Sequence, residues 1–280
     1  MYKNLSLIIC SAVILLLMES CITEDRYVCP SYLTIDMSQI NRDVVNAHIW
    51  FFDPFGKLLR KDTISRSMFS KPYEIEITRE DYASCYMWGN IGKNTLLNEE
   101  YSLNTSLRKE DNLPADSLYS YSCELNTNAE SSYIILKANK EFATVDVVCA
   151  GYCDTTAFNI NVELECRNRG FYVNKNFIEN TTTVKTRLCE LGLDYSMFTA
   201  RILRQGDVND IKLIMNISQK GNLAESSKKD ISADIPIGKY LSENGYNMLA
   251  EDLSDISITV DLVGCFIYIK AEDWVYEKKF

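Results

Sequence analysis

Cysteines are the residues most able to do chemistry in this chain, which contains ten of them among 280 residues. A thiolate can act as a nucleophile, a metal ligand or a disulfide partner, and it can also accept a lipid. Cys21 stands in the segment LLLMESCITED, directly after an apolar run that begins at Leu5 and ends at Met18. Because Cys21 directly follows this run, its chemistry bears on how the chain is exported.

The apolar run has the proportions of a secretory signal. It is too short for a membrane-spanning helix, which needs about 20 apolar residues. The positive charge of Lys3 precedes the run and small Ser20 follows it, as is typical of a signal peptide. The segment also resembles a bacterial lipobox, so we predict a signal peptide over residues 1–20 and lipid attachment at Cys21. The alternative is an ordinary signal peptide in which Cys21 is incidental.

The mature chain would keep eight further cysteines. An even number in an exported protein favours disulfides, but eight cysteines allow 105 pairings. Several stand in apolar strand patterns, where a buried free thiol is equally ordinary. The sequence therefore leaves the pairing open among Cys29, Cys85, Cys123, Cys149, Cys153, Cys166, Cys189 and Cys265.

Motifs for catalysis are weak in this sequence. His48 is the only histidine, and its place in VVNAHIWFF indicates a packed strand residue. Ser226 to Lys229 match SxxK without the companion motifs of that enzyme class. Asp207, Asn209 and Asp210 loosely fit a calcium loop, but the required glycine does not follow. We predict that the protein is not an enzyme and uses no cofactor or metal.

The charge balance argues against nucleic acid as a partner. The chain has 29 Lys and Arg residues against 39 Asp and Glu residues, a net charge of −10. The basic residues form no stripe, and a phosphate backbone would be repelled by this excess of acidic groups.

Apolar and polar residues alternate with a period of two in much of the chain, most clearly in residues 73–78, 158–166, 211–217 and 256–262. Such alternation predicts half-buried strands in antiparallel sheets. Residues 53–56, Asp-Pro-Phe-Gly, fit a type I turn, and Asn168-Arg169-Gly170 is expected to break a strand. Only Pro236 to Leu241 reads as a short helix. We predict an all-β fold built of β-sandwich domains.

A polar stretch from Asn126 to Ser132 separates two strand-rich halves. Polar segments of this kind are where domain boundaries usually fall. We predict an N-terminal β-sandwich domain over residues 21–128 and a C-terminal one over residues 129–280.

The order of several short motifs resembles a known family. Cys29-Pro30 follows soon after the lipobox-like cysteine, Phe51-Phe52-Asp53 with Gly56 resembles an early hairpin, and Tyr86 to Asn90 resembles a strand that ends in Trp-Gly-Asn. The segment from Phe266 to Lys270, with Trp274, resembles a closing strand and tryptophan. Together these features resemble the FimB-type anchor subunits of type V (Bacteroidales-type) fimbriae, over nearly the whole mature chain.

The resemblance implies two transthyretin-like (immunoglobulin-like) β-sandwich domains and a non-enzymatic role on the cell outer membrane. A lipid on Cys21 would hold a surface-exposed protein that tethers a fimbrial shaft and limits its length. Its partners would be fimbrial stalk subunits, reached by strand exchange, in which an edge receives a donated strand. The candidate partner strand consists of Cys265, Phe266, Ile267, Tyr268, Ile269 and Lys270.

A surface glycan-binding lipoprotein is the alternative, and a peripheral hydrolase is a third possibility. The chain has seventeen tyrosines, and these could form a carbohydrate-stacking platform with Trp50, Trp88 and Trp274. Aromatic residues at alternating strand positions are more often core or cross-strand pairs. Exposed coplanar aromatics would favour glycan binding, whereas an open groove or an exchangeable terminal strand would favour the fimbrial role.

Overall fold

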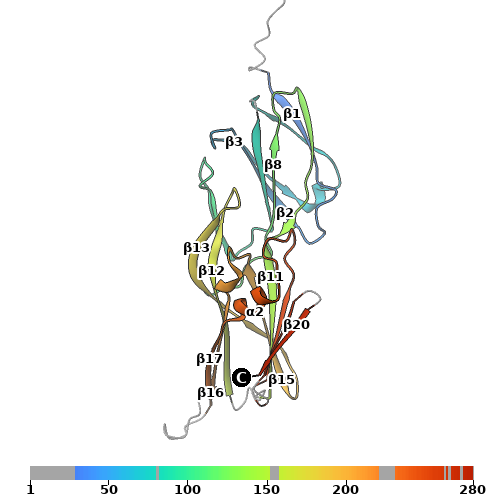
Figure 1. The fold of residues 1–280 in the computed structure, drawn as a ribbon. Helices are drawn as coiled ribbons and strands as arrows, with labels where there is room; N and C mark the ends of the chain where they lie inside the picture. The colour runs from blue at the N-terminus through green and yellow to red at the C-terminus, as the bar shows by residue number, and fades with distance from the viewer. Residues whose placement is uncertain are drawn as a thin grey trace, which may run out of the picture.

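A computed structural model describes residues 29–79, 82–151, 158–220, 231–261, 263, 266–271 and 274–279. Strands dominate it, and they form four sheets (Figure 1). The all-β prediction is therefore confirmed. No helix in these ranges is both long enough and apolar enough to cross a membrane.

Two sheets form the N-terminal half of the molecule, at the upper end in Figure 1. Sheet I has the strand order β4-β1-β9, and sheet II has the order β10-β8-β5-β2-β3. Their strands are β1 (Ser31–Asp36), β2 (Asn46–Phe52), β3 (Leu58–Ser65), β4 (Tyr73–Ile77), β5 (Ala83–Gly89), β8 (Tyr119–Leu125), β9 (Ser131–Ile135) and β10 (Asn139–Lys140), with a 3-10 helix at Arg66–Met68.

Two larger sheets form the other half. Sheet III has the order β17-β16-β12-β7-β6, with β13 paired to β12, and sheet IV has the order β14-β15-β11-β18-β19-β20. Their strands are β6 (Thr95–Asn98), β7 (Ser106–Lys109), β11 (Phe142–Ala150), β12 (Phe158–Tyr172), β13 (Phe177–Lys185), β14 (Arg187–Leu191), β15 (Tyr195–Leu203), β16 (Lys212–Gln219), β17 (Ile231–Ile235), β18 (Ile256–Asp261), β19 (Phe266–Ala271) and β20 (Trp274–Lys279); helix α2 (Ile237–Glu243) and a 3-10 helix at Val208–Asp210 complete the half.

The period-two segments form strands as expected. Residues 73–78, 158–166, 211–217 and 256–262 correspond to β4, β12, β16 and β18, and the short helix corresponds to α2. Most of their inward side chains are buried, because alternate residues of a strand face the same side of a sheet; Tyr73, Phe158 and Ile160 are half-buried. The prediction of antiparallel pairing is right for most strands but wrong for two pairs, since β1 runs parallel to β9 and β11 runs parallel to β18. In both cases a long stretch of chain separates the two strands, which lets them pair in parallel.

Asn168-Arg169-Gly170 does not end a strand, contrary to expectation. Strand β12 continues through these residues, and its pairing with β13 shifts register on both sides of Asn168. Bulges of this kind bend a strand without ending it. A Cβ on Gly170 would lie 2.1 Å from the carbonyl oxygen of Leu107 on β7. The glycine therefore serves the close approach of two strands rather than a turn.

Three groups of buried side chains fill the molecule. The N-terminal core lies in the half formed by sheets I and II, and the C-terminal core in the half formed by sheets III and IV. A third group, the junction core, includes Trp50 and Trp88 from sheet II together with Phe171 and Leu203 from the other half. The Trp88 indole Nε1 donates a hydrogen bond of 2.9 Å to the carbonyl oxygen of Val173. The two halves thus share buried apolar surface.

The chain crosses between the halves more than once. Strands β6 and β7 precede residue 128 but pair in sheet III, whereas β9 and β10 follow it and pair in sheets I and II. Strand pairing therefore does not divide at a single residue. The boundary between residues 128 and 129 stays a prediction.

Candidate functional site

Cys21 and the signal peptide 1–20 lie outside the described residues. Lipid attachment at Cys21 therefore stays a prediction. The description of the chain begins at Cys29 and Pro30, just before β1, which lies in the upper half of the molecule in Figure 1.

The candidate partner strand corresponds to β19, except for Cys265, which lies outside the described residues. Strand β19 is an interior strand of sheet IV, between β18 and β20. Ile267 lies opposite Val260 on one side and Lys278 on the other, and its side chain is completely buried. A partner could pair with β19 only after displacing one of its neighbours. Its contact with a stalk subunit stays a prediction. The edge strands of sheet IV are β14 and β20.

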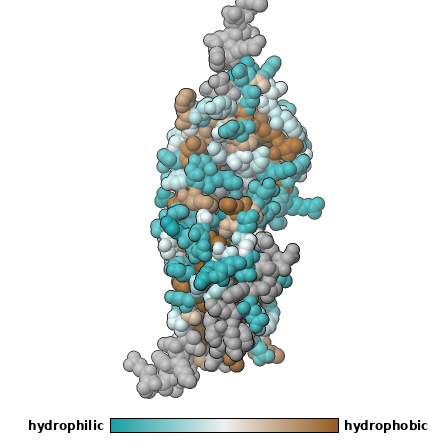
Figure 2. All heavy atoms as spheres, viewed as in Figure 1, coloured by the Kyte–Doolittle hydropathy of each residue, from teal (hydrophilic) through white to brown (hydrophobic). Residues whose placement is uncertain are grey.

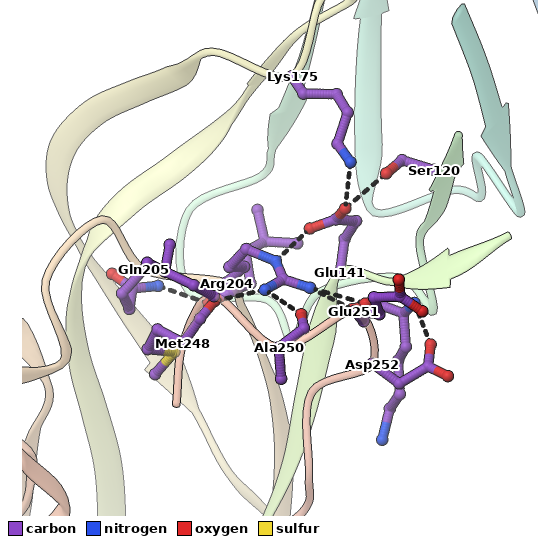
Figure 3. A network of polar contacts seen from close by, with 12 residues as sticks. Ser120, Glu141, Lys175, Arg204, Gln205, Met248, Ala250, Glu251 and Asp252 are labelled. Atoms are coloured by element: carbon purple, nitrogen blue, oxygen red, sulfur yellow. Dashed lines mark hydrogen bonds and ion pairs between the residues drawn. The ribbon is translucent and has the colours of Figure 1, made fainter. Parts of the chain in front are cut away.

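A buried cluster of charges lies where the two halves meet (Figure 3). We call it the polar junction, and it consists of Ser120, Glu141, Lys175 and Arg204. Glu141 directly precedes β11 and Arg204 directly follows β15. Because Phe142 pairs with Leu203 across these strands, the two charged residues next to them are brought together.

Glu141 is almost completely inaccessible to water, with 1% of its surface exposed. Ser120 Oγ on β8 donates to its Oε1 at 2.5 Å, and Lys175 Nζ lies 3.2 Å from the same oxygen. Arg204 Nε donates to Oε2. Burying a carboxylate costs several kcal/mol unless it is paired and hydrogen-bonded. Both oxygens of Glu141 meet that requirement.

Arg204 also fastens the loop that precedes β18. Its Nη1 donates to the carbonyl oxygens of Met248 and Ala250, and its Nη2 donates to those of Lys140 and Glu251, at 3.0 and 3.1 Å. With Nε bonded to Glu141, every guanidinium N–H group has an acceptor. The planar fork of donors explains why arginine suits a site that must order several carbonyl groups at once.

The residues next to Arg204 extend this network towards β12. Gln205 Oε1 accepts hydrogen bonds from the backbone N–H groups of Arg167 and Asn168, at 3.0 and 2.8 Å. Asn168 Nδ2 donates to the carbonyl oxygen of Arg204 at 2.7 Å. These contacts satisfy backbone groups that the bulge in β12 removes from the strand ladder.

The polar junction is suited to holding elements together rather than to catalysis. The Arg204 donors are all engaged, and Glu141 is shielded from water and paired with cations. No sequence pattern predicts this cluster, because a charged residue next to an apolar strand usually faces solvent. Only the register between β11 and β15 places Glu141 beside Arg204.

His48 is a packed strand residue, as predicted. Its ring stacks on Trp50 with centroids 5.8 Å apart, and Nδ1 lies 3.1 Å from Thr63 Oγ1. Burial lowers the pKa of His48 below its ordinary value, and the positive charge of Lys61 lowers it further. The histidine is therefore neutral at pH 7.

Asp207, the first residue of the candidate calcium loop, has a local structural role. Asp207 caps the 3-10 helix after β15 by accepting a hydrogen bond of 2.9 Å from the Asn209 N–H group. Within the described ranges, His, Cys, Asp and Glu side chains form no group of three that could hold a metal ion. The SxxK segment at residues 226–229 lies outside the described residues.

Trp50 and Trp88 cannot form a stacking platform, because both are buried in the junction core. Phe55 and Tyr101 are instead the most exposed aromatic residues in the described part of the chain, at 93% and 87%. Their two loops touch, since the Leu58 N–H group donates to the carbonyl oxygen of Tyr101 at 3.2 Å. On the face shown in Figure 2, hydrophobic residues form several separate groups among hydrophilic ones.

Comparison with known proteins gives matches only among solved structures. No family model matches the sequence, and neither does any curated protein. The fimbrial anchor protein Mfa2 from Porphyromonas gingivalis is similar over 88% of this chain and 99% of its own, with 13% identity and a TM-score of 0.62. A candidate polysaccharide-binding protein from Bacteroides thetaiotaomicron covers 90% of this chain and 98% of its own, with 13% identity and a TM-score of 0.63.

A candidate adhesin from Bacteroides ovatus is also similar, with 12% identity and a TM-score of 0.60 over 89% of this chain and 96% of its own. The chain shares the fold of these proteins. The β-sandwich prediction and the resemblance to fimbrial anchor subunits are thereby confirmed at the level of fold. At these identities the likeness concerns the fold alone.

Proposed function

We propose that this protein is a fimbria-associated surface protein that tethers a fimbrial shaft to the outer membrane through a lipid on Cys21 and limits the length of the shaft. The observation that supports the proposal most strongly is the likeness to a fimbrial anchor protein over 99% of that protein's chain. The likeness extends through both halves of the molecule and is not limited to one β-sandwich domain.

The polar junction gives the proposal a mechanical basis. A tether must carry force between its membrane end and its fibre end, and here that force would pass through the contact between the two halves. Ser120 and Lys140 belong to sheet II, whereas Glu141 and Arg204 flank strands of sheet IV. The Ser120–Glu141 bond and the bond from Arg204 to the Lys140 carbonyl oxygen therefore cross the contact. Trp88 adds a hydrogen bond across the same contact, to the Val173 carbonyl oxygen, and its ring packs in the junction core.

The fibre partner would meet the protein at a sheet edge. Among the described strands, β20 pairs only with β19, so its other edge is open to a partner strand. Strand addition at such an edge gains main-chain hydrogen bonds. The run Glu277, Lys278 and Lys279 is charged, and charge on an edge disfavours indiscriminate pairing. Such an edge would favour a partner strand whose charges complement those of β20.

Glycan binding is the second candidate function, because Phe55 and Tyr101 are highly exposed on touching loops. Aromatic rings at a surface can stack on apolar ligand faces. Replacing both residues with alanine would abolish glycan binding by this route. The same replacement should leave attachment of a shaft unchanged.

Electron microscopy of cells and culture medium after deletion of the gene tests the tethering function. Stalk subunits can still complement one another, so polymerisation continues while fibres grow longer or shed into the medium. Unchanged cell-bound fibres would contradict the proposal and favour the glycan-binding alternative. Restoring the gene must restore fibre length and attachment.

A further inference from the structure

Cys85 and Cys123 lie directly opposite each other on neighbouring antiparallel strands. Strand β5 pairs with β8 in the register that sets Cys85 against Cys123. Directly opposed residues of an antiparallel pair have Cα atoms about 4.5 or 5.5 Å apart. Both separations fall within the range of about 4.4–6.8 Å that disulfides span. The strand register therefore meets the backbone requirement for a disulfide.

The two side chains also meet. The Cys85 thiol is completely buried in the N-terminal core, and Cys123 packs against that core while staying partly accessible. A hydrogen bond between the two thiols raises the pKa of Cys85 and lowers that of Cys123. Cys123 is thus the thiol that solvent can reach and that ionises more readily.

A buried cysteine on a strand does not by itself have such a partner. Cys166 on β12 is also buried, but the residue opposite it on β13 is Thr182, and its pairing with β16 ends one position earlier, at Glu165. Burial raises the pKa of Cys166 to about 12. Cys166 therefore serves as a matched control for the Cys85 and Cys123 pair.

We propose that Cys85 and Cys123 form a disulfide in the oxidising cell envelope, made by exchange with an oxidised thiol–disulfide oxidoreductase. The pairing rests on the strand geometry, whereas the compartment rests on the export that the proposed function includes. The bond would join β5 to β8, two interior strands of sheet II.

The reaction proceeds in two exchanges. The Cys123 thiol loses its proton to solvent, and the thiolate attacks one sulfur of the oxidant's disulfide, so that a mixed disulfide forms and one thiolate leaves. The Cys85 thiol then passes its proton to the leaving sulfur of the oxidant while its own sulfur attacks Cys123 Sγ, which frees that leaving sulfur as a thiol. Two protein thiols lose two electrons in total, and one disulfide of the oxidant is reduced to two thiols.

A covalent link between these strands would stiffen the half of the molecule formed by sheets I and II. A disulfide limits the freedom of the unfolded chain, and the effect grows with the length of the loop it closes. The loop closed here contains the whole of β6 and β7. Because these strands pair in sheet III, the bond would restrain an element that belongs to both halves.

The test is peptide mapping without reduction, on the mature chain from residue 22 onward and on protein isolated from cell envelopes. After exposure of the reduced mature chain to excess oxidised glutathione, we expect one linked peptide pair that contains Cys85 and Cys123. Oxidation should raise the melting temperature by about 5–15 °C. The Cys123→Ser variant should lose the linked peptide and the shift, whereas Cys166→Ser should keep both.

The outcomes separate the pairing from the compartment. A folded chain whose Cys85 and Cys123 stay reduced, or whose Cys123 stops at a glutathione adduct, would overturn the disulfide. A link that forms in glutathione but is absent from envelope protein would overturn formation of the disulfide in the cell, whereas the proposed tethering function would stand. The linked pair in both samples would establish the proposal.

Discussion

Arg204 and Glu141 are joined twice: the guanidinium Nε donates to the Glu141 carboxylate, and the Arg204 N–H group donates to the Glu141 carbonyl oxygen at 2.9 Å. The side-chain contact depends on charge, whereas the backbone contact continues the pairing of β11 with β15. A substitution can therefore remove the ion pair without removing the strand pairing. This makes the energetic role of the polar junction measurable.

Arg204→Ala should lower the free energy of unfolding by about 3–5 kcal/mol, because it leaves the buried Glu141 carboxylate without its main partner. Replacing both residues with apolar ones, as in Arg204→Met with Glu141→Leu, should recover much of that loss. Urea denaturation of the unchanged chain, Arg204→Met, Glu141→Leu and the double variant completes a cycle that measures the coupling. Lys212→Ala, which removes an exposed ion pair with Glu165, should change the free energy of unfolding little, because solvent screens such a pair. Equal losses for Arg204→Ala and Lys212→Ala would contradict the role of the junction.

Gly170→Ala tests the close approach of β12 to β7. The added Cβ would lie 2.1 Å from the Leu107 carbonyl oxygen, so the strands must move apart. We expect a loss of about 1–3 kcal/mol in the free energy of unfolding, measured in urea. Gly206→Ala is the control, because its Cβ would meet its nearest atoms at 3.6 Å. A Gly170→Ala protein as stable as the unchanged chain would show that β12 and β7 can move apart easily.

Asp36 gives a prediction for pH dependence. Hydrogen bonds from the Ser38 N–H group and from the Tyr133 hydroxyl hold the pKa of Asp36 below its ordinary value of 3.8. A carboxyl group with a lowered folded pKa stabilises the fold above its unfolded pKa, and this stabilisation is lost as the pH falls through the folded pKa. Tyr133→Phe should raise the pKa of Asp36 and reduce the contribution of its ionised carboxylate to the stability of the fold.

Titration of the Asp36 carboxyl signal by nuclear magnetic resonance measures this change. Tyr195→Phe is the matched control, since the Tyr195 hydroxyl bonds to Glu190 in a separate exposed pair. The control should leave the Asp36 titration where it was. An unchanged Asp36 pKa in Tyr133→Phe would show that the Ser38 N–H group alone sets it.

Much of the fold could be predicted from the sequence, because alternation along a strand is a local property. The strand of Tyr73 follows from this alternation, and the short helix after Pro236 follows from its start and stop residues. The parallel pairing of β1 with β9 and of β11 with β18 could not be predicted, because the alternation within one strand does not identify the neighbouring strand. The direction and register of pairing depend on contacts that are distant in sequence.

The same limit applies to the sites. Glu141 and Arg204 stand far apart in the chain, and Cys85 and Cys123 were two among eight cysteines until the register placed them opposite each other. Trp50 and Trp88 were candidates for a binding platform, and the structure places both in the junction core. A residue type suggests chemistry, but only the neighbours brought by the fold decide its role.

Cys21→Ala tests the lipid anchor. Without the thiol there is no acceptor for acyl chains, so labelling with a fatty-acid analogue should disappear and the protein should leave the membrane fraction. Cys29→Ala is the control, because it removes the next cysteine in the chain and keeps the lipobox-like segment intact. Undiminished labelling of Cys21→Ala would refute the attachment site.

Ile267→Pro separates two roles for the candidate partner strand. Proline removes a backbone N–H group, and at an interior strand this breaks a ladder hydrogen bond whichever neighbour receives it. Because β19 is paired on both sides and the Ile267 side chain is buried, we expect the substitution to destabilise sheet IV by about 3 kcal/mol or more. A thermal melt followed by circular dichroism measures the loss. A protein that melts as the unchanged chain does, yet no longer holds fibres on the cell, would instead show that β19 leaves its sheet to pair with a stalk subunit.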